Sequence, residues 1–379
     1  MNEFQLKLYT DLDNLVNSNE TFFKQPYVLD GVNYIIFNYR LASYQDFCAN
    51  NALECRGIMF EVDAIGQPVR LASFPPTKFF NLYENPFTMG LDLTGIEAIE
   101  HKVDGSLIST YIHQNELRLK SKGSLTSDQA LNAMNWLNQP EHSQYKEDLY
   151  SLAVNQYTVN LEWMSPDNRI VIGYESPQLT ILNIRNNTTG EYHYLGNTKD
   201  WLDKINPKYI NNTVDTQGLD LVEFVNQIPD MVGIEGFVVR LKSGQSIKIK
   251  TKWYMSLHHT KDSINNPRRL FESVIDEGVD DLRAMFYDDP VAMDMINNMQ
   301  TKVDHLYNHM VNSVESFYNE NKHLERKNFA IKAQQEIDHL YFSLVMSLYL
   351  GQVPTYKEYI KSKWKLLGLK DEKVVSYTE

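Results

Sequence analysis

The spacing of apolar residues changes once along this chain, near residue 262, and this change restricts the folds open to it. From about residue 27 to 255, short runs such as Thr158-Val159-Asn160-Leu161-Glu162-Trp163 alternate apolar with polar side chains, with Gly, Pro and Asn between them. Such alternation predicts strands, while helical spacing appears at 126–138 and 143–155. We expect a mixed α/β region with mainly antiparallel sheets, preceded by a helix and a polar stretch within residues 1–25.

After residue 262 the chain has the spacing of helices. One face of a long helix is predicted by apolar residues that recur every three or four positions: Ile296, Met299, Val303, Leu306, Met310, Val314 and Phe317. A second helix is predicted by Ile337, Leu340, Phe342, Leu344, Val345 and Leu348, and Gly351 and Pro354 suit its end. We therefore predict two domains, residues 1–261 and an all-α domain of residues 262–379.

Composition limits the possible functions. The chain has 379 residues and a net charge of −13, from 36 basic and 49 acidic residues, which argues against a protein that coats nucleic acid non-specifically. A local basic groove is compatible with that charge. No apolar run approaches the roughly 20 residues that span a bilayer, and the N-terminus lacks the features of a secretory signal. Cys48 and Cys55 suggest reduced thiols, so we expect a cytoplasmic protein with no membrane partner.

Lys102-Val103-Asp104-Gly105 lies between two apolar alternating runs and is the first candidate for chemistry. A lysine amine can act as a nucleophile toward phosphorus. The Asp-Gly step turns the backbone and lets it pass close to a nucleotide, because glycine has no Cβ. Alone, the same pattern also fits a surface hairpin turn.

Two carboxylates and two lysines follow downstream. Glu162 lies inside an apolar strand, where a carboxylate costs free energy unless it is paired or bound to a ligand or metal; a structural salt bridge is the alternative. Glu235-Gly236 opens another strand. In the next strand, alternation places Lys248 and Lys250 on one face, where an anion such as a triphosphate would relieve their repulsion. A solvated edge strand is the alternative there.

Further cations lie upstream of these strands. Arg56 precedes a glycine, and Lys78 precedes the aromatic pair Phe79-Phe80, which could stack on a base. Lys120 lies in a basic segment with small residues, for which an ordinary polar turn is the alternative. These cations become informative when they are taken together with the order of Lys102, Glu162, Glu235, Lys248 and Lys250 along the chain.

That order is Lys-x-Asp-Gly, a strand Glu, Glu-Gly on a strand, and then Lys-x-Lys. It resembles the nucleotidyltransferase superfamily of polynucleotide ligases and mRNA capping enzymes, and more closely the bacteriophage tRNA-repair RNA ligases. The resemblance runs from about residue 34 to 285 and more loosely to the C-terminus. It is carried by Leu53-Glu54-Cys55-Arg56-Gly57, Lys78-Phe79-Phe80-Asn81-Leu82, Glu84-Asn85-Pro86-Phe87, Leu119-Lys120-Ser121-Lys122-Gly123, Asn168-Arg169-Ile170-Val171-Ile172, Lys248-Ile249-Lys250 and Trp253-Tyr254.

The resemblance implies an α+β fold, in which a nucleotidyltransferase (ATP-grasp-like ligase) domain built on antiparallel sheets is followed by an all-α C-terminal domain. It implies an ATP-dependent RNA ligase that joins an RNA 5′-phosphate to a 3′-hydroxyl through lysyl-AMP on Lys102 and an RNA-adenylate. The implied partner is nicked tRNA, broken in its anticodon loop and recognised by the helical domain. No obligate protein partner is evident, and a viral enzyme of this kind would work in the host-cell cytoplasm.

The resemblance also implies roles for single residues. Lys248 and Lys250 would contact the α-phosphate of ATP, Glu235 would bind a catalytic Mg²⁺, and Glu162 would hold the ribose. The other implied ATP-site residues face the outgoing phosphates or line the pocket: Arg56, Lys78, Lys120, Phe80, Gly105, Tyr39 and Tyr254. The pair Asp280-Asp281 resembles a metal-binding pair, with an acidic helix start as the alternative.

Two other functions are compatible with parts of this pattern. One is another covalent nucleotidyltransferase, either a DNA ligase or a GTP-using capping enzyme; these usually carry a β-barrel after the last lysine motif, so the helical tail disfavours them. The other is a non-catalytic RNA-binding protein, which the presence of every motif residue disfavours. In the favoured function, the attacking lysine must be uncharged, and the ordinary pKa of lysine is about 10.4, so neighbouring cations must favour the neutral form.

Overall fold

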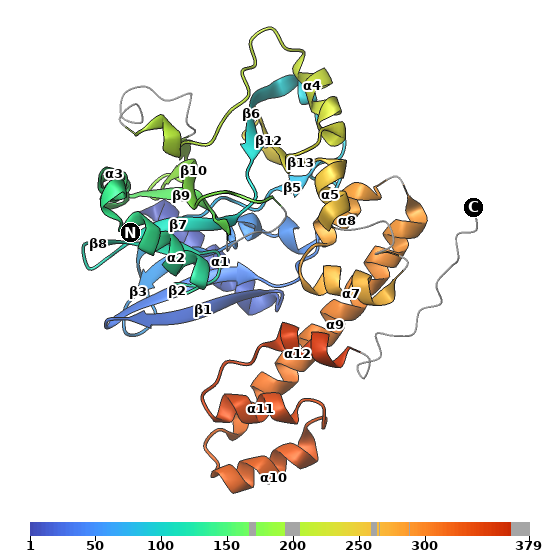
Figure 1. The fold of residues 1–379 in the computed structure, drawn as a ribbon. Helices are drawn as coiled ribbons and strands as arrows, with labels where there is room; N and C mark the ends of the chain where they lie inside the picture. The colour runs from blue at the N-terminus through green and yellow to red at the C-terminus, as the bar shows by residue number, and fades with distance from the viewer. Residues whose placement is uncertain (167–171, 194–204, 259–263, 265, 288, 365–379) are drawn as a thin grey trace. The chain divides into compact units, whose positions relative to one another are not determined.

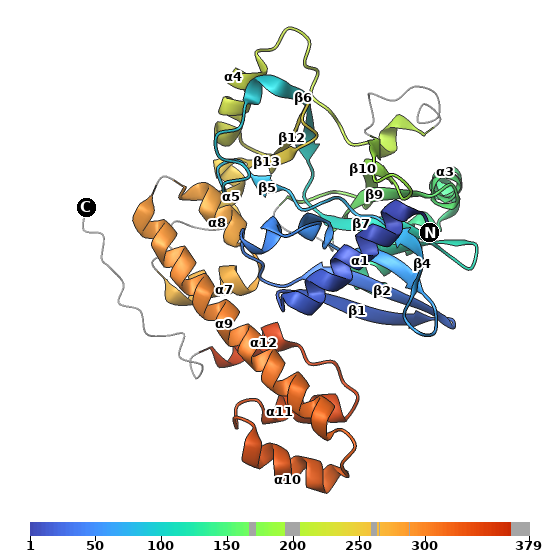
Figure 2. The same cartoon turned by 180° about the vertical axis from the view of Figure 1, so that it is seen from behind.

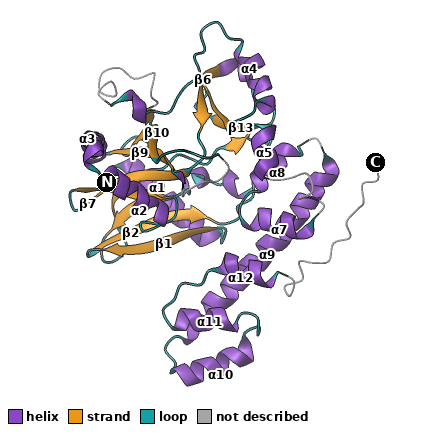
Figure 3. Ribbon diagram, viewed as in Figure 1, coloured by secondary structure: helices purple, strands orange, loops and turns teal. Residues whose placement is uncertain are grey.

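The computed structural model describes residues 1–379 except 167–171, 194–204, 259–263, 265, 288 and 365–379 (Figure 1). The chain divides into two compact units, Met1–His258 and His259–Glu379. The first unit contains all of the described strands, and the described regular elements of the second unit are helices (Figure 3). The antiparallel sheets and the helical C-terminal region expected from the sequence are thereby confirmed.

The first unit contains three sheets. One has the order β1 (Phe22–Leu29), β2 (Val32–Tyr39), β3 (Ile58–Val62), β4 (Pro68–Ser73). The second has the order β11 (Tyr192–His193), β10 (Gln178–Asn186), β9 (Tyr157–Met164), β7 (Ser106–His113), β8 (Glu116–Ser121). The third has the order β5 (Phe80–Asn81), β13 (Ser246–Lys250), β12 (Gly236–Leu241), β6 (Ile96–Lys102). Among the described strand pairs, only the short pair of β5 with β13 is parallel.

Helices cover two of these sheets. Helix α1 (Glu3–Ser18) begins at Asn2, whose side chain accepts a hydrogen bond from the Gln5 backbone N–H at 2.9 Å. Its apolar side packs on the β1–β4 sheet, as Figure 2 shows from behind. The helices predicted at 126–138 and 143–155 are α2 (Asp128–Leu137) and α3 (Ser143–Val154), which share a core with the five-stranded sheet. Two further short helices of this unit are α4 (Leu221–Gln227) and α5 (Lys252–His258).

One expectation for this unit was wrong. The polar stretch predicted up to residue 25 contains the start of β1, because Phe22 is buried in the core and its ring centroid lies 5.8 Å from that of Phe47. Two adjacent aromatic residues, Phe22 and Phe23, followed by polar residues do not show the alternation of a strand.

The second unit contains α7 (Pro267–Ile275), α8 (Val279–Met285), α9 (Pro290–Asn321), α10 (Arg326–Glu336), α11 (Phe342–Tyr349) and α12 (Tyr356–Lys363). The predicted long helix is α9, which buries all of the predicted face except Leu306; that residue is only partly covered. The second predicted helix was wrong in its bounds, because α10 ends before Ile337, which has extended backbone, and α11 begins only at Phe342. Gly351, at φ +74°, follows the end of α11.

Candidate active site

Strand pairing brings two distant lysines to one carboxylate. Gly236, the first residue of the central strand β12, is paired with Lys102 on β6 and with Lys250 on β13. Glu235 precedes it, and its Oε1 lies 2.9 Å from Lys102 Nζ and 3.2 Å from Lys250 Nζ. The Glu235 side chain is 2% exposed, and its Oε2 has no hydrogen-bond partner among the described residues. A buried acceptor in that state is costly unless a ligand or ion satisfies it.

Glycine is required beside this carboxylate. Gly236 has φ +149°, and a Cβ at this position would lie 2.0 Å from the Ile249 carbonyl oxygen. Any side chain would therefore push β13 away from β12, and Lys248 and Lys250 with it. The Glu-Gly pair thus sets the spacing between the carboxylate and the lysines of the next strand.

The Lys102–Gly105 segment is not a hairpin turn. Strand β6 ends at Lys102 in the four-stranded sheet that contains β12, whereas β7 begins at Ser106 in the five-stranded sheet. The segment crosses between the sheets, so the hairpin alternative is wrong. At Gly105 a Cβ would lie 2.4 Å from the Trp163 carbonyl oxygen, so the glycine is required for close approach to β9.

Asp104 anchors this crossing. It is 2% exposed, and its Oδ1 accepts a hydrogen bond from the Tyr254 hydroxyl at 2.8 Å, while its Oδ2 accepts one from the Ile172 N–H at 2.7 Å. Its own backbone N–H donates to the Tyr174 hydroxyl oxygen at 3.0 Å. These bonds fix the backbone two residues after Lys102 and so restrict where the lysine can point.

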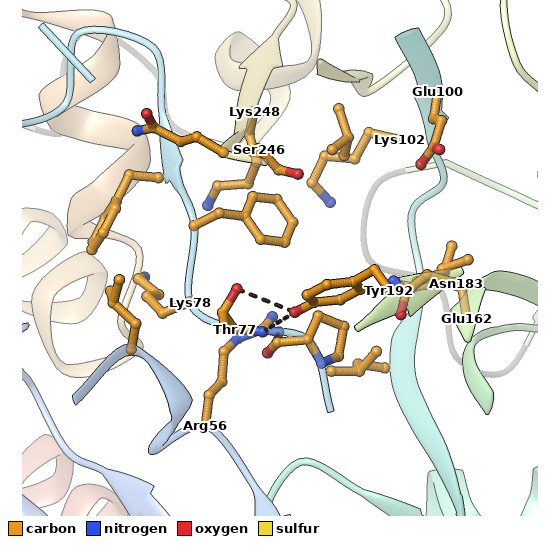
Figure 4. Close-up of a pocket in the computed structure, with 18 of the residues that line it drawn as sticks. Arg56, Thr77, Lys78, Glu100, Lys102, Glu162, Asn183, Tyr192, Ser246 and Lys248 are labelled. Atoms are coloured by element: carbon orange, nitrogen blue, oxygen red, sulfur yellow. Dashed lines mark hydrogen bonds between the residues drawn. The ribbon is translucent and has the colours of Figure 1, made fainter. Parts of the chain in front are cut away.

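Lys102 lies in a cavity of about 810 Å³ between the sheets (Figure 4). The described cations that line it are Arg56, Lys78, Lys102, Lys248 and Lys250, together with the carboxylates Glu100 and Glu162 and the rings of Phe79, Phe80, Phe87 and Tyr192. On β13 the predicted alternation holds: Ile247 and Ile249 are buried, and Lys248 and Lys250 line the cavity. A cavity of this size with this charge suits an anionic ligand of nucleotide dimensions.

Glu162 lies on β9 in the wall of this cavity. Burial raises its pKa from 4.5 to about 7; Lys102 acts in the opposite direction, Glu235 adds to the rise, and Arg56 opposes it. The carboxyl can therefore hold a proton near neutral pH and donate as well as accept a hydrogen bond.

Three of the predicted ATP-site residues lie behind the cavity wall. Lys120 is fully buried, and its Nζ donates to the carbonyl oxygens of Gly57 at 2.7 Å and Ser121 at 2.9 Å; burial lowers its pKa to about 7. Tyr254 is 2% exposed and bonded to Asp104. Tyr39 places its ring centroid 5.7 Å from Lys78 Nζ, so that it supports a lysine of the cavity.

The predicted metal ligands belong to different units. Glu235 is in the first unit, and Asp280 and Asp281 are in the first turn of α8 in the second unit. Among the described residues, no group of three or more His, Cys, Asp or Glu side chains is arranged to hold a metal ion. The buried, unsatisfied Glu235 Oε2 does suit Mg²⁺, which binds few protein carboxylates and completes its shell with phosphate and water. Residues 168–171 of the family pattern lie outside the described residues.

Glu100 and Tyr192 are among the cavity residues that the sequence did not predict. Glu100 precedes Lys102 by two on β6, so strand alternation alone places both on one face, and this signal was available. Tyr192 lies on the two-residue strand β11, and its hydroxyl oxygen accepts a hydrogen bond from the Thr77 N–H at 2.8 Å. Nothing in the local pattern marks this tyrosine, because its position depends on a contact across 115 residues.

Comparison with known proteins identifies the class. Residues 54–254 match the family model described as RNA ligase, and residues 261–370 match that of the T4 RNA ligase 1 C-terminal domain. The chain belongs to the RNA ligase family. The resemblance seen in the sequence and the prediction of an RNA ligase are confirmed.

Several relatives carry the same description. The chain is 26% identical to RNA ligase 1 of bacteriophage TS2126 over 261 residues, which cover 67% of this chain and 63% of that protein. It is 25% identical to a candidate RNA ligase of Thermovibrio ammonificans over 324 residues, covering 83% and 81%. A solved archaeal ATP-dependent RNA ligase is 10% identical, with a TM-score of 0.46 and 83% of each chain covered. None of the described helices is long and apolar enough to cross a membrane.

Proposed function

We propose that this RNA ligase is ATP-dependent and joins an RNA 5′-phosphate to a 3′-hydroxyl through AMP carried on Lys102. The observation that carries the proposal is the meeting of Lys102 and Lys250 on Glu235 Oε1, at 2.9 and 3.2 Å, inside a cavity lined by further cations. Lys102 Nζ would attack the α-phosphorus of ATP and displace pyrophosphate. The AMP would then pass to an RNA 5′-phosphate, and a 3′-hydroxyl would displace it as the strand is sealed.

The geometry provides for the proton of the nucleophile. Glu235 Oε1 lies 2.9 Å from Lys102 Nζ, so it would accept the proton that the amine must lose before it attacks phosphorus. Lys250 shares that oxygen, and Lys248 lies on the same face of β13. Both would stabilise the charge that develops on the phosphoryl oxygens.

The remaining cavity groups divide between the two ends of ATP. Arg56 and Lys78 would hold the outgoing phosphates, and Phe80 would contribute to the cavity wall. Glu162, with its pKa raised to about 7 by burial, would bind the ribose hydroxyls. Gly105 would let the backbone carrying Lys102 lie against β9.

Mg²⁺ would bind at Glu235, whose buried Oε2 suits it, and Asp280-Asp281 at the start of α8 are proposed as a metal-binding pair of the helical unit. Bound there, it would neutralise phosphate charge and compete with both ammonium groups for the carboxylate. The proposed substrate is tRNA broken in its anticodon loop, selected by the helical unit, and the proposed location is the cytoplasm, that of the host cell for a viral enzyme.

Labelling the protein with ATP or GTP tests this function. The protein is incubated with Mg²⁺ and ATP or GTP labelled at the α-phosphate, and protein-bound label is measured before and after acid treatment. Acid-labile label from ATP alone supports a lysyl-AMP enzyme, because a phosphoramidate is cleaved by acid. Label from GTP would support a capping-type enzyme, and no label from either would support a non-catalytic RNA-binding protein.

A further inference from the structure

Arg185 is a buried arginine that binds the two loops carrying Arg56 and Lys78, which line the cavity. It lies on β10 opposite Tyr192 on β11, and its side chain is 4% exposed. Its Nη2 and Nη1 lie 2.6 and 2.7 Å from the two carboxylate oxygens of Glu54, and Nη1 also donates to the Pro75 carbonyl oxygen at 2.9 Å. The guanidinium also stacks 3.4 Å from the Phe74 ring centroid.

Each of these contacts falls close in sequence to a cation of the cavity. Glu54 lies two residues before Arg56, and Pro75 lies three residues before Lys78. The Arg185 guanidinium also lies 4.6 Å from the ring centroid of Tyr192. The hydroxyl of that ring accepts a hydrogen bond from the N–H of Thr77, the neighbour of Lys78.

The two loops are also bonded to each other. The Lys78 N–H donates to the Leu53 carbonyl oxygen at 2.8 Å, and Arg56 Nη1 donates to the Pro76 carbonyl oxygen at 3.3 Å. These bonds join the two loops to each other, and the Phe74 N–H also donates to Thr158 Oγ1 of the five-stranded sheet at 2.8 Å. Arg185 comes from the five-stranded sheet and ties both loops to it through charged, bidentate and stacked contacts.

We propose that Arg185 is a positioning residue that fixes the separation of Arg56 and Lys78 and thereby the binding of the outer phosphates of the nucleotide. This inference rests on the proposed function, in which those two cations face the β- and γ-phosphates. Arg185 does not line the cavity, so its effect passes through Glu54, Pro75 and Tyr192. It follows that the first step, which uses the triphosphate, depends on Arg185 more than sealing of RNA that already carries AMP.

The double variant Glu54→Gln, Arg185→Met tests this dependence without leaving a buried carboxylate unpaired. The matched control is Glu61→Gln, Arg70→Met, which removes an ion pair of 2.7 Å and a donor to the Ile112 carbonyl oxygen at 2.6 Å, away from the cavity cations. For each protein, the rate of lysyl-AMP formation is measured against ATP concentration, and sealing of pre-adenylated RNA is measured separately. The single variant Arg185→Lys is included because lysine keeps the charge and loses the bidentate fork.

The expected result is a KM for ATP raised about tenfold or more in the Glu54/Arg185 variant, with sealing of pre-adenylated RNA within about twofold of wild type. Arg185→Lys should also raise the KM, and the control should leave it unchanged. An unchanged KM, with every step reduced in proportion to the folded fraction, would show a purely structural arginine and overturn the inference. Wild-type protein that takes no label from ATP would instead overturn the proposed function, and this inference with it.

Discussion

Replacing Glu162 with glutamine should make the free protein more stable at alkaline pH and slow its reaction with ATP. Burial raises the pKa of the Glu162 carboxyl from 4.5 to about 7. Below pH 4.5 the group is protonated in both folded and unfolded chains and costs nothing. As the pH rises above 4.5, Glu162 ionises in the unfolded chain before it ionises in the folded chain. The free energy of unfolding therefore falls until about pH 7, above which the full penalty remains. A pKa change of this size corresponds to about 3 kcal/mol.

Glutamine has nearly the shape of the protonated acid and does not titrate. The Glu162→Gln variant should therefore match wild type near pH 4.5 and exceed it by about 3 kcal/mol at pH 8, an advantage of roughly 6–12 °C in Tm for a unit of this size. Lysyl-AMP formation should fall by about tenfold or more, because the ribose loses a partner that can carry charge. Thermal unfolding at pH 5 and pH 8, with single-turnover labelling by ATP, measures both effects.

Glu116→Gln is the control for this experiment. Glu116 is 66% exposed on β8 and pairs with Arg118 at 2.7 Å, so its replacement should change stability by less than about 1 kcal/mol at either pH. The reasoning about Glu162 is refuted if its glutamine variant is no more stable than wild type at pH 8. That outcome would mean that Lys102 and Arg56 keep the Glu162 carboxylate ionised in the free protein, and that burial does not dominate.

Other substitutions probe the neighbouring groups. Lys102→Ala should abolish protein-bound AMP in a labelling assay yet still seal pre-adenylated RNA, and label at wild-type levels would exclude Lys102 as the nucleophile. Gly236→Ala should destabilise the first unit by about 2–5 kcal/mol in denaturant unfolding, because its Cβ would lie 2.0 Å from the Ile249 carbonyl oxygen at φ +149°; an unchanged midpoint would contradict this. Deleting residues 262–379 should leave labelling by ATP largely intact and reduce the preference for tRNA over simple single strands; a folded fragment that cannot take label would place part of the catalytic machinery in the helical unit.

The sequence predicted local properties of the site better than its assembly. Alternation identified β13 and the faces of its residues correctly, because the pleat depends only on neighbouring residues. The hairpin interpretation of Lys102–Gly105 was wrong, because the residues of a turn do not determine which sheet the next strand joins. The pairing of Lys102 with Gly236 spans more than a hundred residues, and no local pattern encodes it.

Lys120 shows how tertiary packing overrides a strand pattern. On β8, Leu117 and Leu119 are buried on one face, so alternation places Lys120 on the opposite face. In the structure the opposite face is also covered, because the Gly57 carbonyl oxygen lies against the lysine Nζ at 2.7 Å. A strand covered on both faces needs a partner for every polar group, and backbone carbonyl oxygens supply it here. The identity of such partners cannot be read from β8 alone.

The two acid–glycine pairs of the site illustrate why similar motifs have different roles. Asp104-Gly105 and Glu235-Gly236 each place a carboxylate that is 2% exposed before a glycine whose Cβ would strike a neighbouring strand, at 2.4 and 2.0 Å. Both oxygens of Asp104 accept hydrogen bonds from Tyr254 and Ile172, so that carboxylate is used within the fold. Glu235 forms ion pairs with both lysines through Oε1, and its Oε2 has no hydrogen-bond partner among the described residues. Because a buried acceptor in that state costs about 1–3 kcal/mol, the Oε2 atom supports the ligand or ion that we propose at Glu235, whereas both oxygens of Asp104 already accept hydrogen bonds.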